Sequence, residues 1–201
     1  MKIIKINPSN PDSTIINKAV LVLKKGGVLM YPTDTCYGLG ADISNLKSIN
    51  KIYAIKKRAN TKPISVIVPD VNYIAKLAII TKQQQAYIDK YFPGAVTLIF
   101  STLNQNKFPF NTIGIRIPDY PITQQIANQF QGAFATTSAN ISAYPPAYNV
   151  NDFLNQLKIN DLKPDLILDA GELENKGVST VVDLTQNSPK IVRQGMVKIS
   201  L

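Results

Sequence analysis

The chain has 201 residues, of which 45% are hydrophobic and 17% charged, a composition typical of an ordered globular protein rather than a disordered one. It contains no histidine and a single cysteine, Cys36, which excludes histidine-based catalytic triads, Cys/His zinc sites and internal disulfides. The formal net charge of +9 is compatible with an anionic substrate or RNA, but taken alone it slightly favours a soluble protein with incidental affinity for polyanions.

Targeting and membrane signals are absent from the sequence as it stands. No apolar run reaches the length of a membrane span, and residues 1–12 lack the apolar block of a signal peptide. We therefore expect a cytoplasmic protein that makes no membrane contact.

Apolar periodicity predicts strands and helices that alternate along most of the chain. The first half is expected to contain, in order, a strand at 3–6, a helix at 12–27, a strand at 28–32, a glycine-containing loop at 33–41, a helix at 45–57 and a strand at 63–68. One or two helices within 70–91 follow. The second half is expected to contain a strand at 95–100, a polar loop at 101–111, a strand at 112–118, a helix at 120–130, a strand at 133–139, a proline-rich loop at 141–150, a helix at 150–157, and closing strands at 166–171, 179–184 and 190–195.

This alternation predicts an α/β fold: a twisted, mixed parallel and antiparallel sheet with flanking helices. Because no helix separates the three closing strands, part of the sheet is expected to be antiparallel. No repeat, low-complexity tract or linker interrupts the pattern, so residues 1–201 are predicted to form a single domain. Within the strand at 112–118, three isoleucines alternate with Gly114 and Arg116, which predicts that Arg116 faces away from them.

The arginines are the most informative polar residues. Among 22 basic residues only three are arginine: Arg58, Arg116 and Arg193. Each lies at the edge of a predicted strand or helix, and a further polar cluster, TTSAN at 136–140, ends a strand. A guanidinium group binds carboxylate or phosphate with two parallel hydrogen bonds, which lysine does not do. Convergence of these groups at strand ends would form a site for phosphate and carboxylate together.

Each piece also has an ordinary structural explanation. Lys56 and Lys57 end a predicted helix, where cations complement the helix dipole, and for that segment alone this is the simpler explanation. Arg116 could face solvent, and TTSAN could be a plain turn. Cys36 is expected to be a small core residue because no neighbouring base activates its thiol. The sequence YGLG is too short to indicate a phosphate loop.

Six motifs taken together resemble the YrdC-like threonylcarbamoyl-AMP synthase family in its short, single-domain form. They are YPTDTCYGLG, KKRANTKPISV, TIGIRIP, TTSANIS, STVVDLT and IVRQG, and they occur in the family's order with compatible spacing, from Val28 to Gly195. All three arginines lie inside them. The resemblance implies a YrdC-like fold with a large basic cavity.

The resemblance also implies a reaction. The chain would be an L-threonylcarbamoyladenylate synthase, a nucleotidyltransferase that condenses L-threonine, bicarbonate or CO2, and ATP into threonylcarbamoyl-AMP and pyrophosphate. The product would serve N6-threonylcarbamoylation of adenosine 37 in tRNA through separate transfer proteins. ATP would be used with Mg2+, and no protein ligand for that metal can be assigned from the sequence.

Residue roles are carried over by matching positions within the motifs. Lys56 and Arg58 would hold the ATP phosphates and serve catalysis, while Lys57 remains a solvated helix end. Further contacts to the nucleotide are expected from Thr112, Ser138, Asn140, Pro146 and Arg193. L-Threonine would be surrounded by Thr35, Arg116, Thr136 and Ser179, with Arg116 taking its carboxylate.

Two positions depart from the family pattern. Ile67 stands where many members carry a histidine near threonine, and Ala143 replaces a usual glycine, which could alter the loop at 142–150. The main alternative is a YrdC-like paralogue that binds double-stranded RNA or tRNA without making an adenylate. A regulatory domain like those attached to larger carbamoyl-transfer enzymes is a weaker alternative. Retention of both the Lys56–Arg58 and Ser138–Asn140 pairs favours the enzyme.

Overall fold

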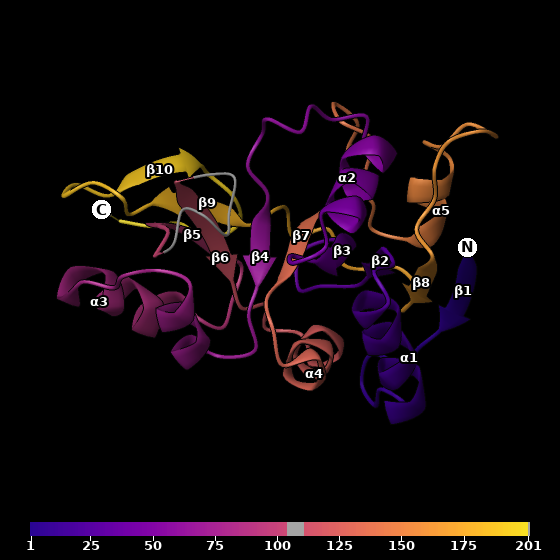
Figure 1. Ribbon diagram of the computed structural model, residues 1–201, viewed down its shortest axis with the longest axis horizontal. Helices are drawn as coiled ribbons and strands as arrows, with labels where there is room; N and C mark the ends of the chain where they lie inside the picture. The colour runs from indigo at the N-terminus through magenta and orange to yellow at the C-terminus, as the bar shows by residue number, and fades with distance from the viewer. Residues whose placement is uncertain (104–110, 201) are drawn as a thin grey trace.

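A computed structural model describes residues 1–103 and 111–200 and contains one ten-stranded mixed sheet (Figure 1). The strand order is β1-β8-β2-β3-β7-β4-β6-β5-β9-β10. The strands are β1 (Lys2–Lys5), β2 (Leu29–Tyr31), β3 (Gly38–Asp42), β4 (Ser65–Ile67), β5 (Val96–Ser101), β6 (Thr112–Arg116), β7 (Phe134–Ser138), β8 (Leu166–Asp169), β9 (Thr180–Asp183) and β10 (Lys190–Arg193). The predicted α/β class is confirmed. Most of the polar loop predicted at 101–111 lies outside the described residues.

Antiparallel pairing is distributed across the sheet. Strands β2 and β3, β3 and β7, β4 and β7, and β5 and β6 pair antiparallel, as do β9 and β10. Strand β8 instead pairs parallel with β1 and β2, and β9 pairs parallel with β5. The expectation that part of the sheet is antiparallel is confirmed. Of the three closing strands, β9 and β10 pair antiparallel, whereas β8 lies in the other half of the sheet.

Helices cover both faces of the sheet. They are α1 (Ser13–Lys24), α2 (Leu46–Ile55), the 3-10 helix η1 (Val71–Lys76), α3 (Lys82–Tyr91), α4 (Pro121–Phe130) and α5 (Val150–Leu154). In Figure 1, α2 and α5 lie above the sheet and α1 and α4 below it. The first pair packs on a cluster containing Leu39 and Ile167, and the second on one containing Tyr31 and Phe134. None of the helices in the described chain is long and apolar enough to cross a bilayer.

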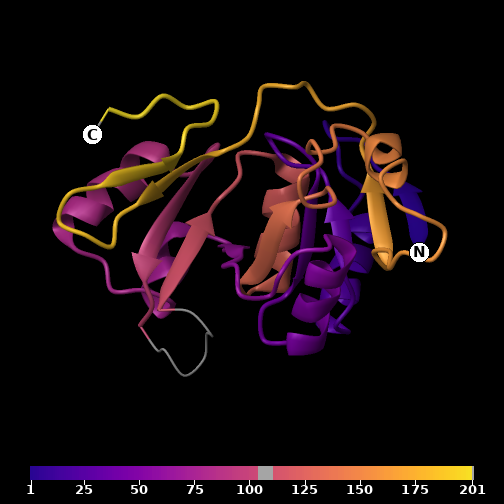
Figure 2. The same ribbon diagram turned by 90° about the horizontal axis from the view of Figure 1, so that it is seen from above.

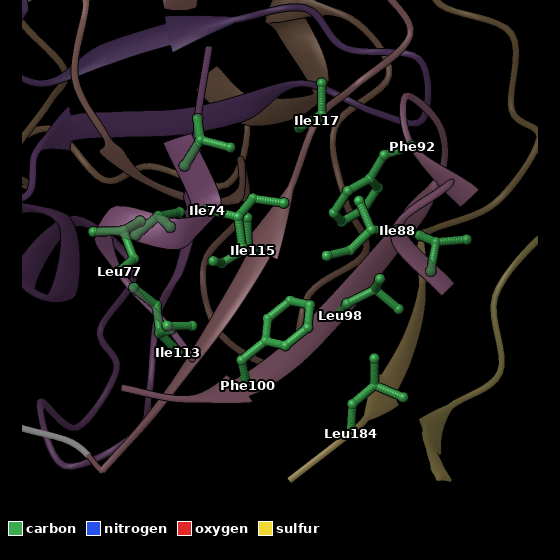
Figure 3. Close-up of a cluster of buried hydrophobic side chains, with 14 of the residues drawn as sticks. Ile74, Leu77, Ile88, Phe92, Leu98, Phe100, Ile113, Ile115, Ile117 and Leu184 are labelled. Atoms are coloured by element: carbon green, nitrogen blue, oxygen red, sulfur yellow. The ribbon is translucent and has the colours of Figure 1, made fainter. Parts of the chain in front are cut away.

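A third apolar cluster lies beneath the other end of the sheet, where η1 and α3 meet β5 and β6 (Figure 3). The isoleucines at 113, 115 and 117 all point into it. Because side chains alternate across a strand, Arg116 must emerge on the opposite face, as the sequence pattern predicted. This cluster thus holds the strand that carries one of the three arginines.

Strand β3 corrects the expected loop at 33–41. Glycine is a poor strand former, so the pattern YGLGA predicts a loop. In the structure the ring of Tyr31, on the neighbouring strand β2, lies against the two glycines, and a Cβ atom on Gly40 would come within 2.9 Å of that ring. The glycines of this motif therefore allow close packing of an aromatic ring, and the Tyr31 hydroxyl reaches Thr136 Oγ1 at 2.5 Å.

The connection from β8 to β9 is long because the two strands lie in different halves of the sheet. Residues 170–179 cross from one half to the other along one side of the molecule (Figure 2). Near its start, the carbonyl of Gly171 accepts a hydrogen bond from the Tyr37 hydroxyl at 2.8 Å. Its end brings Val178 and Ser179 over the sheet face that carries Arg116.

Candidate functional site

A cavity of about 430 Å3 lies over one face of the sheet. Its wall includes residues from six strands: Gly38 from β3, Thr136, Thr137 and Ser138 from β7, Ser65 from β4, Arg116 from β6, Thr97 from β5 and Val181 from β9. Small and hydroxylated residues predominate, so the sheet is hollowed there and offers many hydrogen-bonding groups. The site lies on a sheet face, whereas strand ends were expected to form it.

Five cationic residues line this cavity, and no aspartate or glutamate is among its lining residues: the five are Lys56, Arg58, Lys62, Arg116 and Arg193. All three arginines of the chain therefore meet in one place, although they are far apart in sequence. Lys57, between Lys56 and Arg58, is outside the lining and forms an ion pair with Asp161 at 2.9 Å. This arrangement matches the predicted orientation of the three consecutive cations.

The turn that ends α2 separates these cations. The Arg58 N–H donates to the Tyr53 carbonyl at 3.0 Å, and the Lys57 N–H donates to the Ala54 carbonyl at 3.1 Å. This is the Schellman pattern, in which the residue after the helix cap takes a left-handed conformation. Lys57 has φ of 50°, a position where glycine is usual. The reversal directs Lys56 and Arg58 to the cavity and leaves Lys57 outside.

Lys56 is almost fully buried and lies at the centre of a polar network. Its ammonium donates to the Ser138 carbonyl at 2.6 Å, to the Asn140 carbonyl at 3.0 Å and to Asn140 Oδ1 at 2.8 Å. Asn140 Oδ1 also accepts from the Ser138 hydroxyl at 2.6 Å. Burial, together with the nearby Arg58 guanidinium, lowers the pKa of Lys56 to about 7. The hydrogen bonds of Lys56 therefore connect the motif KKR, to which it belongs, directly with the motif TTSAN.

Arg116 is buried and held by the loop that follows β2. Its Nη1 donates to Thr35 Oγ1 at 3.0 Å, its Nη2 to Asp34 Oδ1, and its Nε to the Gly94 carbonyl at 3.3 Å. The Thr33 hydroxyl donates to the Cys36 carbonyl at 2.7 Å and so tightens the same loop. The structure thus brings Thr35 and Arg116 together, as predicted for a threonine site.

Ser179 and Arg193 form the opposite wall. Arg193 donates through Nε and Nη2 to the Ser179 carbonyl, at 3.1 and 2.9 Å, and Nη2 also reaches the Ser179 hydroxyl at 2.9 Å. The chain after Arg193 lies very close to this segment, since a Cβ atom on Gly195 would be 2.2 Å from the Val178 carbonyl oxygen. The glycine of IVRQG therefore permits the approach that holds Arg193 in place.

Not every predicted site residue reaches the cavity. Thr112, at the start of β6, and Pro146 are outside the residues that line it. Ile67, one of the two positions expected to depart from the family pattern, is fully buried in the apolar cluster of α1 and α4 and belongs to the core. Cys36 was expected in the core; it is buried but lines the cavity, and burial raises the pKa of its thiol.

Ala143 adopts a conformation that glycine favours, with φ of 72°. It lines the cavity, and its loop is held where the Asn140 side-chain amide donates to the Tyr144 carbonyl at 2.7 Å. An alanine in the left-handed region costs about 1–2 kcal/mol relative to an ordinary conformation. The loop therefore keeps a glycine-like path despite the alanine, at an energetic cost.

We expect Ala143→Gly to increase the free energy of unfolding by about 0.5–1 kcal/mol, because relief of strain exceeds the entropy that glycine adds to the unfolded chain. Thermal and urea unfolding measure this. Ala59→Gly is the matched control, since Ala59 is exposed and is not among the positive-φ residues. A loss of stability equal to the control's would contradict the strain assignment.

Several lining residues were missed by sequence reasoning: Thr33, Gly38, Lys62, Ser65 and Thr97. Thr33, Gly38, Lys62 and Ser65 lie inside quoted motifs and could have been found there. Thr97 lies outside the motifs as a single polar residue in an apolar strand, and the alternation of that strand was the available signal. No group of three or more His, Cys, Asp or Glu suited to a metal occurs within 1–103 and 111–200.

Fold and cavity define a mixed α/β protein with a hydroxyl-rich, cationic pocket on its sheet. The model of the Sua5/YciO/YrdC family, described as telomere recombination, matches residues 21–195. The chain belongs to this family.

Three individual proteins illustrate the similarity. A Methanocaldococcus jannaschii protein named "Putative threonylcarbamoyl-AMP synthase" is 32% identical over 98% of this chain and 95% of its own length. The Bos taurus "Threonylcarbamoyl-AMP synthase" is 35% identical over 85% of this chain, which spans 63% of that protein. The structure of P. abyssi Sua5 complexed with L-threonine superposes with a TM-score of 0.87 at 24% identity, over 97% of this chain and 58% of Sua5.

Proposed function

We propose that this chain is an L-threonylcarbamoyladenylate synthase that makes threonylcarbamoyl-AMP and pyrophosphate from L-threonine, bicarbonate or CO2, and ATP. The observation that carries the proposal is the convergence of Arg58, Arg116 and Arg193 with two lysines in one cavity that has no acidic lining residue. The names of relatives that are 32% and 35% identical support the same activity. The carboxylate of threonine and the triphosphate of ATP are both anionic, which suits a cavity lined by cations.

The nucleotide is proposed to lie on the side of Lys56 and Arg58, with Ser138, Asn140 and Arg193 nearby and Thr112 and Pro146 at greater distance. Lys56 acts there chiefly as a buried charge and as an organiser of residues 138–140, because its ammonium already has three protein acceptors. Arg58, which donates to the Pro63 carbonyl at 2.9 Å, has further N–H groups for phosphate oxygens.

L-Threonine is proposed to bind between Thr35, Thr136 and Ser179, with its carboxylate on Arg116. Three contacts of Arg116 use three of its five N–H groups, which leaves donors for a substrate carboxylate. In the absence of a histidine, no side chain here suits general base catalysis at neutral pH except a neutral Lys56.

The chemistry requires little covalent help. The amine of threonine adds to CO2 and loses a proton, giving a carbamate. A carbamate oxygen attacks the α-phosphorus, the bond to the bridging oxygen breaks, and pyrophosphate leaves with that electron pair. Such a transfer depends on alignment and charge neutralisation, which Lys56 and Arg58 supply. Mg2+ enters as part of MgATP, held by phosphates and water, since the cavity lining has no carboxylate to hold it.

The activity is tested by pyrophosphate release from ATP with Mg2+ and bicarbonate, with and without L-threonine, and with L-serine as the control substrate. We expect release that requires threonine, and a product with the mass of threonylcarbamoyl-AMP. Folded protein that releases no pyrophosphate would contradict the proposal. Binding of double-stranded RNA or tRNA by such inactive protein would favour the paralogue instead.

The cellular setting follows from the product. We propose that the chain works in the cytoplasm as a single domain and supplies threonylcarbamoyl-AMP to transfer proteins acting on adenosine 37 of tRNA. Direct binding of tRNA or double-stranded RNA is a separate proposal supported by the net charge of +9. Whether residues 142–150 close over the nucleotide is addressed by comparing their proteolysis with and without ATP.

We expect Arg116→Lys to raise the KM for threonine by about tenfold and the KM for ATP by less than about twofold, because a planar fork is replaced by a point charge. Steady-state pyrophosphate release measures both constants. Lys57→Arg serves as a control, since that side chain lies outside the cavity. Equal losses for both substrates would argue against a carboxylate role for Arg116.

A further inference from the structure

We propose that Asp34 is a positioning residue, which fixes the guanidinium of Arg116 so that it can recognise the carboxylate of the amino-acid substrate. The proposal rests on the synthase function proposed above and adds a residue to it. Asp34 lies between Thr33 and Thr35, which both line the cavity, while Asp34 itself does not. Its side chain therefore acts from behind the cavity wall.

Both carboxylate oxygens of Asp34 have a donor. Oδ1 accepts from Arg116 Nη2 at 2.5 Å, and Oδ2 accepts from the backbone N–H of Asp119 at 3.3 Å. The Asp34 and Arg116 side chains are only 14% and 10% exposed. The contact to the Asp119 N–H is long, so what fixes the guanidinium is mainly the short, largely buried ion pair between Asp34 and Arg116.

The other contacts of Arg116 do not define its position to the same degree. Nη1 meets the Thr35 hydroxyl at 3.0 Å, and Nε meets the Gly94 carbonyl at the long distance of 3.3 Å. Both partners are neutral. The charged guanidinium is the donor in all three hydrogen bonds, but only Asp34 adds the attraction of an opposite charge, in a pair that is largely shielded from solvent, so Asp34 dominates the orientation of the fork.

The remaining donors suit a substrate. Three of the five N–H groups of Arg116 have partners in the described part of the chain, which leaves one on each terminal nitrogen. A bidentate carboxylate needs two such donors in fixed geometry. Asp34 thus orients the group that binds the carboxylate without contacting it.

Asp34 has a second effect, which would weaken the binding of threonine. Its negative charge partly neutralises Arg116 and repels an incoming carboxylate. If this repulsion were larger than the gain from orientation, removing the charge would tighten threonine binding. A loss of threonine binding shows that orientation dominates, and a gain would show that repulsion does.

The test compares Asp34→Asn, Asp34→Glu and wild type in threonine-dependent pyrophosphate release. Asp34→Asn keeps the size and one acceptor oxygen but removes the charge. We expect its KM for threonine to rise about 10- to 100-fold, while its KM for ATP changes by less than about twofold. Asp34→Glu restores the charge with one extra methylene, and we expect it to recover part of the loss.

Asp161→Asn is the matched control, because Asp161 also pairs with a cation, Lys57, but outside the cavity. We expect it to leave both KM values unchanged. An unchanged or lower KM for threonine in Asp34→Asn, or equal increases in both KM values, would overturn the positioning role. If Asp34→Asn does not fold, Asp34→Ser, which also removes the charge, is measured in its place and judged by the same outcomes.

Failure of the proposed function is distinguishable from failure of this inference. Wild-type protein without threonine-dependent release would contradict the synthase itself, and calorimetric titration of L-threonine into wild type and Asp34→Asn then decides the inference. Selective loss of threonine binding in the variant would support the positioning role. Equal binding, or none to wild type, would overturn it.

Discussion

Replacing Arg58 by alanine is expected to lower kcat/KM for threonine-dependent pyrophosphate release by about 10²–10³-fold, while the protein remains folded. Arg58 lines the cavity at the end of the α2 turn, and its guanidinium donates to the neutral Pro63 carbonyl at 2.9 Å. Its charge is therefore available to the pyrophosphate that leaves in the proposed reaction. Pyrophosphate release and thermal unfolding, measured on the same preparation, check both parts of the expectation.

Lys57→Ala is the appropriate control for this variant. It removes the same charge from the adjacent residue, whose side chain pairs with Asp161 outside the cavity. We expect turnover close to wild type, because this side chain lies outside the cavity. Little loss of stability is expected, because exposed ion pairs contribute little to the free energy of unfolding. Wild-type turnover in Arg58→Ala, or an equal loss in Lys57→Ala, would remove Arg58 from the catalytic groups.

The second large effect is expected for Lys56→Met. Methionine fills a similar volume but leaves the two carbonyls of Ser138 and Asn140 and one side-chain oxygen without the ammonium. A buried acceptor that loses its donor costs about 1–3 kcal/mol. We therefore expect lower stability together with nearly complete loss of turnover. Lys57→Met, at the neighbouring position outside the cavity, should have little effect on either.

The pH dependence of ATP binding gives an independent measure of Lys56. Its pKa is lowered to about 7 by burial and by Arg58, so above pH 7 the free protein holds this lysine largely neutral. A bound triphosphate favours the charged form of Lys56, so above pH 7 the binding of ATP must be accompanied by uptake of a proton. Apparent affinity should then fall by up to about tenfold for each pH unit above 7.

Calorimetry of ATP binding at pH 8, in buffers of different ionisation enthalpy, counts that proton. We expect an uptake approaching one in wild type and none in Lys56→Met. Identical uptake in both proteins would assign the titration to another group. The stability of wild type should also rise between pH 7 and 10.5, because over that range the unfolded lysine binds more protons than the folded one.

Much of the architecture could be predicted from the chain. Apolar alternation placed nine of the ten strands, and the isoleucines of β6 gave the correct face for Arg116. Strand β3 was missed because glycine is locally unfavourable in a strand. The reason these two glycines are found there is that the Tyr31 ring, on the neighbouring strand β2, packs against them. Local propensity carries no information about such a contact.

The composition and motifs by themselves determined the class of site. Absence of histidine excluded triad chemistry, three arginines among many lysines indicated forks for phosphate and carboxylate, and six ordered motifs indicated the family. What only the tertiary structure decided is how these groups combine: Lys56 joined to residues 138–140, Arg116 fixed by Asp34, and Arg193 held on Ser179. These contacts join residues 14 to 84 positions apart. Sequence spacing does not specify such distances, because they depend on the order and twist of the strands that bring the segments together.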